Sequence, residues 1–375
     1  MIYCIKMLPF ICLPKGARFM PSKYIILADS LRTLLEQHKT EKNFHLPTEQ
    51  QLSIQYQVSR QTVRHALSIL AEEGLIIRRQ GSGSYPSPDF LSAAARIIAV
   101  ILPDTASYLH SSALRDIQAF FNAHHYTVRI YMTDYLLERE QEILQNLLAE
   151  PPAAILVKPF CTALPNPNLP LFQKLSDQRV PVVFWDEPMP QTRMPGIFPD
   201  YHAGGYALAS YLIRQNHQHI AGIFQKEELE SHEKFAGLVQ ALWEHHLSFD
   251  SRNFYWYDSH PYPYLKKTLD PTSFPEEFLD RISQSCTCVL CHNDEAAYAL
   301  IRALLRKGIS VPRNLAVVSF DDSYLTELSP VSITSMSCGK EKPWSRASRF
   351  LLQKLQGKQP ETAPFTWELQ KRDSG

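Results

Sequence analysis

The chain has 375 residues, of which 45% are hydrophobic and 20% charged, with equal numbers of basic and acidic residues. This composition excludes disordered, collagen-like and coiled-coil proteins, and the length favours two or three domains with a sizeable core. No apolar run reaches the roughly 18 residues of a membrane span. The zero net charge hides an asymmetry, because residues 20–88 hold eight basic and six acidic residues whereas the rest of the chain beyond them is acidic. A polyanionic partner is therefore compatible with the first segment alone.

Residues 1–19 contain three basic and no acidic residues, and they lack the small-residue cleavage site of a signal peptide. Met20 is followed directly by a sequence that begins a domain well. We therefore interpret residues 1–19 as a mis-assigned start or an extension.

The seven cysteines are scattered along the chain, which is typical of a protein from a reducing cytoplasm rather than of a disulfide framework. Cys286, Cys288 and Cys291 lie close together, but a zinc site usually pairs two such motifs. Their segment also reads as a buried strand, in which cysteine acts as a small hydrophobe. We expect no metal and no cofactor.

Residues 22–58 predict two helices. The first, Tyr24–His38, carries isoleucines and leucines at helical spacing. The second begins at Thr48, where Gln51 stands three positions later and completes a capping box. Each helix needs a partner for its apolar face, so we expect them to share one small core.

A third helix is expected to begin after Ser59, its N-cap, and to end at Gly74. Its apolar face consists of Val63, Ala66, Leu67 and Leu70. Its other face offers Arg60, Gln61, Thr62 and Arg64. These side chains are of the types that read base edges and contact phosphates, and they crowd the first turn, the part that a recognition helix inserts into the major groove.

Residues 75–85 predict two short strands joined by the glycine-rich turn Gly81-Ser82-Gly83, which together form a wing. Arg78 and Arg79 lie on the first strand, ready for backbone phosphates. A phosphate-binding loop would need a lysine and a following helix, and this turn has neither. Taken singly, each feature fits a small helical domain with a solvated basic face; their order and spacing favour DNA binding.

Four motifs make that order specific. They are Leu46-Pro47-Thr48-Glu49, Val58-Ser59-Arg60-Gln61-Thr62-Val63-Arg64-His65-Ala66-Leu67, Leu70-Ala71-Glu72-Glu73-Gly74-Leu75-Ile76 and Gly81-Ser82-Gly83. This pattern resembles the winged helix-turn-helix of GntR-type bacterial regulators. The resemblance implies DNA contacts from Ser59, Arg60, Thr62 and Arg64, with Glu49 near the DNA backbone and the wing beside the minor groove. The predicted DNA-binding set is Glu49, Ser59, Arg60, Gln61, Thr62, Arg64, Arg78, Arg79, Gly81, Ser82 and Gly83.

A linker, residues 87–95, is expected between this head (residues 20–86) and the body (residues 96–375). In the body, apolar runs alternate with helical patterns, which predicts buried parallel strands. The first four runs are Ile97–Leu102, Val128–Tyr131, Ala153–Val157 and Val180–Trp185. The second four are Ile220–Phe224, Phe254–Tyr257, Thr287–Cys291 and Leu315–Phe320. Two successive sets predict an α/β body of two doubly wound lobes with a cleft between them.

Ligands of such sheets bind beyond the carboxyl ends of the strands, and those ends are polar in this chain. Asp186 follows one predicted strand, Asn293 another and Asp321 a third. Carboxylates and amides suit a polyhydroxy ligand. Two carboxylates also serve glycosidases as acid and base. No nucleophile–base pattern accompanies them, so we expect no enzyme.

The longest motif of the body runs from Cys291 to Ala297 and from Gly308 to Asp322. It resembles the sugar-sensing core of LacI-type repressors, a fold shared with periplasmic sugar-binding proteins. Carried over position by position, the resemblance implies effector contacts from Asp186, Lys234, Asn293 and Asp321.

The chain departs from that pattern at several positions. Lys234 stands where the family has arginine, and its point charge does not bind paired hydroxyls as the planar guanidinium does. Ser319 and Trp344 each replace a glycine, and residues 335–339 lack the usual proline. Structural alternatives also remain: Asn293 and Asp200 as helix caps, and Asp322 as a solvated residue.

A GntR-type head on a LacI-type core resembles sugar-responsive repressors of the arabinose-regulator kind. This implies a cytoplasmic, nucleoid-associated repressor without membrane association. It would bind operator DNA as a homodimer and respond to a small sugar-like effector in the interlobe cleft. The alternatives are a regulator that has lost effector sensing and a sugar-binding protein without specific DNA binding.

Overall fold

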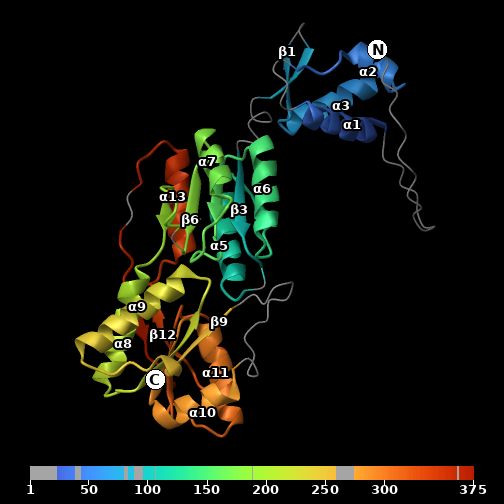
Figure 1. Cartoon of the computed structure of the whole chain (residues 1–375). Helices are drawn as coiled ribbons and strands as arrows, with labels where there is room; N and C mark the ends of the chain where they lie inside the picture. The colour runs from blue at the N-terminus through green and yellow to red at the C-terminus, as the bar shows by residue number, and fades with distance from the viewer. Residues whose placement is uncertain are drawn as a thin grey trace, which may run out of the picture. The chain divides into compact units, whose positions relative to one another are not determined.

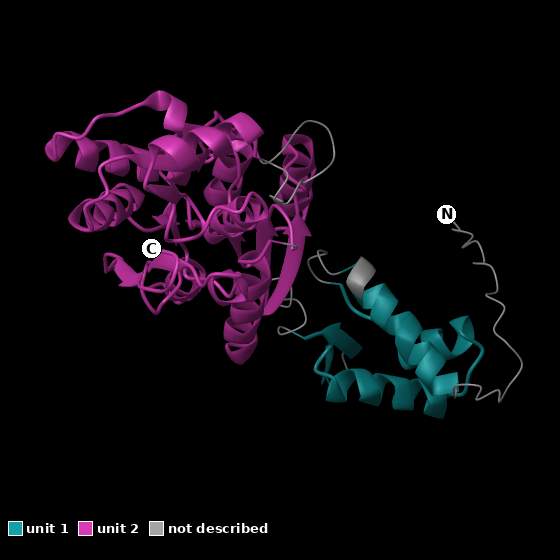
Figure 2. Ribbon diagram, turned by 90° about the horizontal axis from the view of Figure 1, so that it is seen from below, with its two compact units in different colours: residues 1–93 teal, residues 94–375 magenta. Residues whose placement is uncertain are grey.

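The computed structural model of the chain divides into two compact units, residues 1–93 and 94–375 (Figure 2). The structure describes residues 23–38, 44–79, 83–87, 96–105, 107–187, 189–258, 274–360 and 363–375. In this part of the chain, no helix has the length and apolar character needed to cross a membrane. The first unit holds the predicted head and the second the predicted body.

The head contains three helices and a hairpin. They are α1 (Lys23–Gln37), α2 (Glu49–Gln55), α3 (Arg60–Glu72), β1 (Ile76–Arg79) and β2 (Gly83–Pro86), the two strands being antiparallel. All of these elements follow the sequence prediction to within a few residues.

Local signals set the boundaries of these helices. Thr48 and Gln51 form the predicted capping box at the start of α2, and Ser59 caps α3 by accepting from the Thr62 backbone N–H. Gly74 follows α3 with a φ of +72°, a conformation that favours glycine. The core of the head takes its apolar side chains from all three helices and β1. The predicted buried face of α3, Val63, Ala66, Leu67 and Leu70, is confirmed.

The first lobe of the body is a five-stranded sheet in the order β4-β3-β5-β6-β7, with all pairs parallel. Its elements are β3 (Ile97–Leu102), α5 (His110–Ala123), β4 (Thr127–Met132), α6 (Leu137–Ala149), β5 (Ala154–Val157), α7 (Leu169–Asp177), β6 (Val182–Trp185) and β7 (Gly196–Ile197). Strands β3, β5 and β6 are buried, as predicted. Val128–Tyr131 was expected to be a buried strand, and this is wrong, because β4 lies at the sheet edge and is partly exposed.

The second lobe is a six-stranded sheet in the order β13-β12-β11-β10-β8-β9. Its pairs are parallel apart from β12 with β13. Its elements are α8 (Tyr201–Arg214), β8 (Ile220–Gln225), α9 (Leu229–Glu244), β9 (Phe254–Tyr257), α10 (Glu276–Ser285), β10 (Cys288–Cys291), α11 (Asp294–Arg306), β11 (Ala316–Phe320), α12 (Leu325–Leu328), β12 (Thr334–Ser337) and β13 (Glu368–Gln370).

The sequence predicts two lobes that follow one another along the chain. In the structure the chain instead returns to the first lobe near its C-terminus. Helix α13 (Pro343–Leu355) follows the second-lobe strand β12, yet it packs against α5 and β6 of the first lobe (Figure 1). Its Trp344, Ala347 and Leu351 belong to the first-lobe core. The chain then returns to the second sheet through β13. The amphipathic pattern of α13 predicts a buried face but does not indicate which sheet that face covers.

Candidate functional site

The face of α3 opposite its core presents polar side chains to solvent. Arg60, Gln61 and Arg64 are exposed and Thr62 is half-buried. The Ser59 and Thr62 hydroxyls lie 2.8 Å apart at the start of the helix. The structure therefore places the residues predicted for recognition together, in the first turns of one helix.

Glu49 of α2 connects two other elements of the head. Its carboxylate accepts from Arg64 Nε at 2.8 Å and from an Arg78 guanidinium nitrogen at 2.7 Å. Both arginine side chains stay largely exposed, at 66% and 41%. Exposed ion pairs contribute about 0–1 kcal/mol to stability, so the consequence of this bridge is mainly that it orients the two arginines.

The hairpin carries the remaining predicted DNA contacts. The Arg79 guanidinium lies over the Tyr85 ring, 5.1 Å from its centroid. Gly83 has a φ of +116°, which side-chain-bearing residues rarely adopt. Gly81 and Ser82 lie outside the described residues.

The body contains a cavity of about 110 Å³ between its two lobes. It is lined from the first lobe by Pro103, Ser107, Tyr108, Leu109, His110, Tyr135, Lys158, Pro159, Asp186 and Glu187, and from the second by Gln225, Glu228, Glu230, Tyr257, Asn293, Glu295 and Asp321. Three of the four predicted effector residues, Asp186, Asn293 and Asp321, are among them. We call this cavity the cleft.

Asp186 and Asp321 share an unusual backbone conformation, with φ of 71° and 104°. Such residues cost of order 1–3 kcal/mol each and cluster at functional sites. Asp186 follows β6 and Asp321 follows β11, so the left-handed turn redirects each side chain at the end of its strand. The conformation thus brings both carboxylates to the edge of the cleft.

The surroundings of Asp186 favour its ionised form. Burial opposes ionisation, but Lys158 Nζ at 3.1 Å and the Tyr201 hydroxyl at 3.0 Å outweigh it and lower the pKa of Asp186. Lys158 also contacts Glu187 at 2.5 Å. Despite its burial, Lys158 has a raised pKa because these carboxylates surround it. Asp186, Glu187 and Lys158 thus form one ionic group on the first-lobe wall.

Lys234, the fourth predicted effector residue, is completely buried and does not line the cleft. Its Nζ donates to the His292 carbonyl at 2.9 Å and lies 3.5 Å from Glu230. It also lies 4.9 Å from the centroids of the Tyr201 and Phe320 rings. Lys234 therefore places a positive charge near the cleft without lining it.

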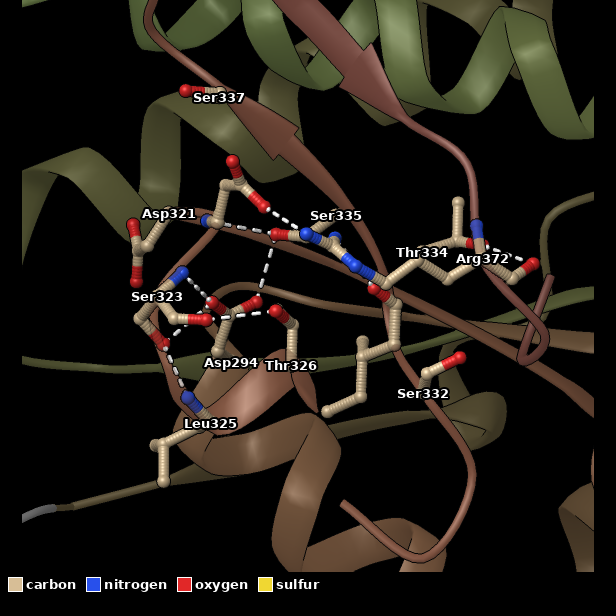
Figure 3. A network of polar contacts seen from close by, with 12 residues as sticks. Asp294, Asp321, Ser323, Leu325, Thr326, Ser332, Thr334, Ser335, Ser337 and Arg372 are labelled. Carbon is tan, nitrogen blue, oxygen red and sulfur yellow. Dashed lines mark hydrogen bonds and ion pairs between the residues drawn. The ribbon is translucent and has the colours of Figure 1, made fainter. Parts of the chain in front are cut away.

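The residues after β10 and β11 form a polar network that supports the cleft (Figure 3). Asn293 caps α11 by accepting from the Ala296 N–H, and Asp294 accepts from Ser319, Ser323 and Ser335. Ser319, which replaces a glycine of the family pattern, is thus a partner of a buried carboxylate.

Asp322 pairs with Arg372 at 2.7 Å and keeps 23% of its side chain exposed, so it has an ion-pair partner as well as contact with solvent. Asp200 does cap α8, by accepting from the Ala203 N–H at 2.9 Å. Both aspartates therefore have structural partners.

Several hydrogen bonds join the lobes directly, among them those of Tyr108 and Thr162. The Tyr108 hydroxyl of the first lobe donates to Asp321 of the second. The Thr162 hydroxyl contacts Glu187 in its own lobe and Glu228 across the cleft, at 3.2 Å from the latter. Burial and the nearby Glu187 raise the pKa of Glu228. Lobe closure thus brings acidic groups together.

The sequence reasoning missed several residues of the cleft. Lys158 comes directly after β5, and Glu187 comes two residues after β6. The rule that ligands bind beyond strand ends applies to both positions and identifies them. Tyr108, which lines the cleft, and Thr162, which contacts its Glu228, lie on loops whose partners come from distant segments, and no local signal marks them.

The cysteine cluster lies where a strand was predicted. Cys288 and Cys291 are the first and last residues of β10 and are buried, and Cys286 is buried just before it. Among the described residues, no group of three or more histidines, cysteines, aspartates or glutamates is arranged to hold a metal ion.

Comparison with known proteins places both units. Residues 24–85 match the model of the gntR family of bacterial regulatory proteins, and residues 209–374 match that of the periplasmic binding protein-like domain. The chain is 26% identical over 338 residues to an arabinose metabolism transcriptional repressor of Geobacillus stearothermophilus, covering 89% of this chain and 91% of the relative.

Solved structures confirm the fold of the body. The transcription regulator CcpA of Lactococcus lactis matches 74% of this chain and 98% of its own, with a TM-score of 0.61 and 21% identity. A cellobiose complex of the transcriptional regulator CelR matches 88% of this chain and 100% of its own, with a TM-score of 0.61 and 19% identity. The chain is a transcriptional regulator that combines a gntR-family DNA-binding domain with a periplasmic binding protein-like domain.

Proposed function

We propose that this regulator represses its target genes by binding operator DNA with α3 in the major groove and the hairpin beside it. The observation that carries the proposal is the polar face of α3, which presents Arg60, Gln61 and Arg64 to solvent while the opposite face is buried. Arginine and glutamine are the side chains that pair bidentately with guanine and adenine. Repression is supported by the names of the relatives, among them the arabinose metabolism repressor.

Sequencing of captured DNA tests this function. The purified protein is mixed with sheared genomic DNA, and the bound fragments are recovered and sequenced. We expect enrichment of a near-palindrome with half-sites about one helical turn apart. Absence of enrichment, with and without a sugar mixture, would contradict specific DNA binding.

We propose further that the regulator works as a homodimer in the cytoplasm, where the DNA lies. Three large apolar side chains of the second lobe support a protein interface, because Leu305, Tyr324 and Leu328 are 39%, 55% and 65% exposed. They lie at or beside α11 and α12, which contact each other. Sedimentation of the wild-type protein and of Leu328→Glu measures the oligomeric state, and a monomeric wild type at micromolar concentration would contradict the proposal.

The cleft is proposed as the effector site, for a small polyhydroxy molecule. Support comes from its place between the lobes, beyond the strand ends, and from the Tyr108–Asp321 hydrogen bond, which a ligand can replace. An effector changes DNA binding only through its different affinity for the two lobe arrangements. Titration of sugars into the protein–operator complex, beginning with L-arabinose, tests this role.

A regulator without effector sensing is the second candidate. The observation that favours it is the size of the cleft, about 110 Å³, against roughly 300 Å³ for the smallest usual ligand pockets. Trp344, in place of a glycine, also packs against Trp185 with ring centroids 6.0 Å apart. If no sugar alters operator affinity or the thermal midpoint of the body, this candidate replaces the first.

A further inference from the structure

The charge of the cleft is strongly one-sided. Its walls carry the carboxylates of Asp186, Glu187, Glu228, Glu230, Glu295 and Asp321. Among the described residues that line it, Lys158 is the one lysine or arginine. Charges a few ångströms apart interact far more strongly in a protein interior than in water. The excess of negative charge therefore determines which ligands the cleft can bind.

The nearby cations do not remove this excess. Lys158 is shared by Asp186 and Glu187, at 3.1 and 2.5 Å. Lys234 lies 3.5 Å from Glu230 but directs its hydrogen bond to the His292 carbonyl. Lys342 donates to the Asp321 carbonyl at 3.0 Å. Three lysines thus lie near five carboxylates of the cleft, namely Asp186, Glu187, Glu228, Glu230 and Asp321.

On the second-lobe wall, the carboxylates take hydrogen bonds from neutral donors. Asp321 accepts from the Tyr108 hydroxyl, and Glu228 accepts from the Cys161 backbone N–H at 3.2 Å. Neutral donors satisfy lone pairs but supply no positive charge, and burial raises the pKa of both carboxylates.

Several hydrogen-bond donors of the cleft are already engaged. The Tyr108 hydroxyl donates to Asp321 and the Tyr135 hydroxyl donates to Asp104, the latter at 2.6 Å. The Gln225 amide donates to Glu227 at 3.1 Å. A ligand that brings donors therefore meets more partners in this cleft than one that brings acceptors. An ammonium group supplies three donors and no acceptor, and its bonds to carboxylates are charge-assisted.

We propose that the effector of this regulator is a hydroxylated molecule that carries a protonated amine, as amino sugars do. The inference rests on the proposed effector role of the cleft and narrows its ligand class. The ammonium group lies against the carboxylates of the second-lobe wall, and the rings of Tyr108, Tyr135 and Tyr257 give it faces for cation–π contact. Phosphorylated and acidic sugars should be rejected, because their anionic groups would lie against the carboxylates of the cleft.

Calorimetric titration of the full-length protein tests the charge of the ligand. The panel consists of D-glucosamine, D-galactosamine and D-mannosamine, each beside its parent sugar, its N-acetyl derivative and the 6-phosphate of its parent. L-Arabinose is added as a neutral reference. Acetylation removes the charge and keeps the skeleton, so each pair isolates the ammonium group. We expect at least one amine to bind tenfold or more tightly than its neutral counterparts, and no 6-phosphate to bind.

Glu230→Gln gives the matched variant, because it removes one carboxylate of the wall and keeps its shape. We expect it to weaken binding of the amine at least fivefold. Glu233→Gln, which lies on the same helix and does not line the cleft, is the control and should leave the affinity unchanged.

Three outcomes would contradict the ligand charge, the position of the ammonium group or the effector role. If L-arabinose or another neutral sugar binds and every amine binds no better than its neutral counterpart, the charge inference is wrong and the effector role stands. If an amine binds but Glu230→Gln does not weaken it, the placement of the ammonium group is wrong. If nothing in the panel binds or alters operator affinity, both the inference and the effector role fall.

Discussion

The two units of this regulator use charge in opposite ways. In the head, the arginines predicted to contact DNA are exposed, and Arg64 keeps 66% of its side chain in solvent. In the body, the charged residues at and near the cleft are enclosed: the side chain of Glu187, which lines it, is 3% exposed, and that of Lys234, which lies behind it, is 0% exposed. Salt screens exposed charges within about 10 Å at 0.1 M, whereas buried pairs are screened much less.

Because of this difference, we expect DNA binding by the head and the properties of the cleft to depend on different solution conditions. Binding to a polyanion by exposed arginines depends steeply on salt. A buried group of carboxylates depends on pH instead, because burial shifts the pKa values of its members. The head should therefore respond to ionic strength and the body to pH. The predictions below run from the largest effect to the smallest.

The largest effect is expected where two body helices touch backbone to backbone. A Cβ on Gly205 of α8 would lie 2.0 Å from the Lys234 carbonyl oxygen of α9. Gly205→Val should therefore lower the free energy of unfolding of the body by about 3 kcal/mol, the upper part of the usual range for overpacking.

Urea unfolding followed by tryptophan fluorescence reports selectively on the body, because all five tryptophans lie there. Ala236→Val, on an exposed position of α9, is the control and should have little effect. An unchanged unfolding midpoint for Gly205→Val would show that α8 and α9 can move apart without destabilising the second lobe.

How far the sequence predicts each unit follows from the range of the interactions that build it. The head depends on local signals: the Thr48–Gln51 capping box, the Ser59 cap and the spacing of Val63 and Leu67 are all readable within one helix. The arginines of α3 then face solvent because the apolar residues fix the opposite face. Even so, the bridge from Glu49 to Arg64 and Arg78 joins three elements and has no local signature.

The cleft depends on contacts between distant segments, so the sequence predicts only part of it. Asp186, Asn293 and Asp321 follow buried strands and were found by that rule. Lys234 was placed by family resemblance, and only the structure shows that its Nζ turns to the His292 carbonyl. Tyr108 meets Asp321, 213 residues further along the chain, and no periodicity predicts such a pair.

The second prediction addresses the exposed charges. Arg64→Ala should weaken operator binding by about 1–3 kcal/mol, roughly 5- to 150-fold, if Arg64 reads a base. A phosphate contact would instead weaken all sequences alike and reduce the slope of log affinity against log salt by about 1. Fluorescence anisotropy on operator and random duplexes at several salt concentrations separates the two.

Arg115→Ala is the matched control, because this arginine of the body is 76% exposed. It should leave both the affinity and the salt slope unchanged. Equal operator affinity for wild type and Arg64→Ala would remove α3 from the recognition surface as assigned.

The third prediction concerns the enclosed charges. Burial raises the pKa of Glu230 to about 7 and that of Asp294 to about 7. Between pH 8 and pH 6 the folded body therefore takes up protons that the unfolded chain does not. The free energy of unfolding should rise as the pH falls through this window, by about 1 kcal/mol for each such group.

Urea unfolding followed by tryptophan fluorescence at pH 8, 7 and 6 measures this rise. Glu230→Gln should remove part of it, because glutamine does not titrate. A body that is less stable at pH 6 than at pH 8 would show that the carboxylates of the cleft are ionised and compensated throughout, against the charge imbalance argued above.

The smallest effect tests whether an ion pair in the head serves function rather than stability. Glu49→Gln frees Arg64 and Arg78, and because the pairs are exposed the head should lose less than about 1 kcal/mol of stability. Glu73→Gln removes a comparable exposed pair with Arg32 and should lower the stability of the head by a similar amount.

The two variants should differ in DNA binding. Without Glu49 the arginines gain freedom to contact any phosphate, so affinity for random duplex should rise a few-fold and the preference for operator should narrow, whereas Glu73→Gln should change neither. If both variants bind operator and random DNA alike, the bridge from Glu49 has no part in recognition, and the orientation of Arg64 and Arg78 is set by the DNA itself.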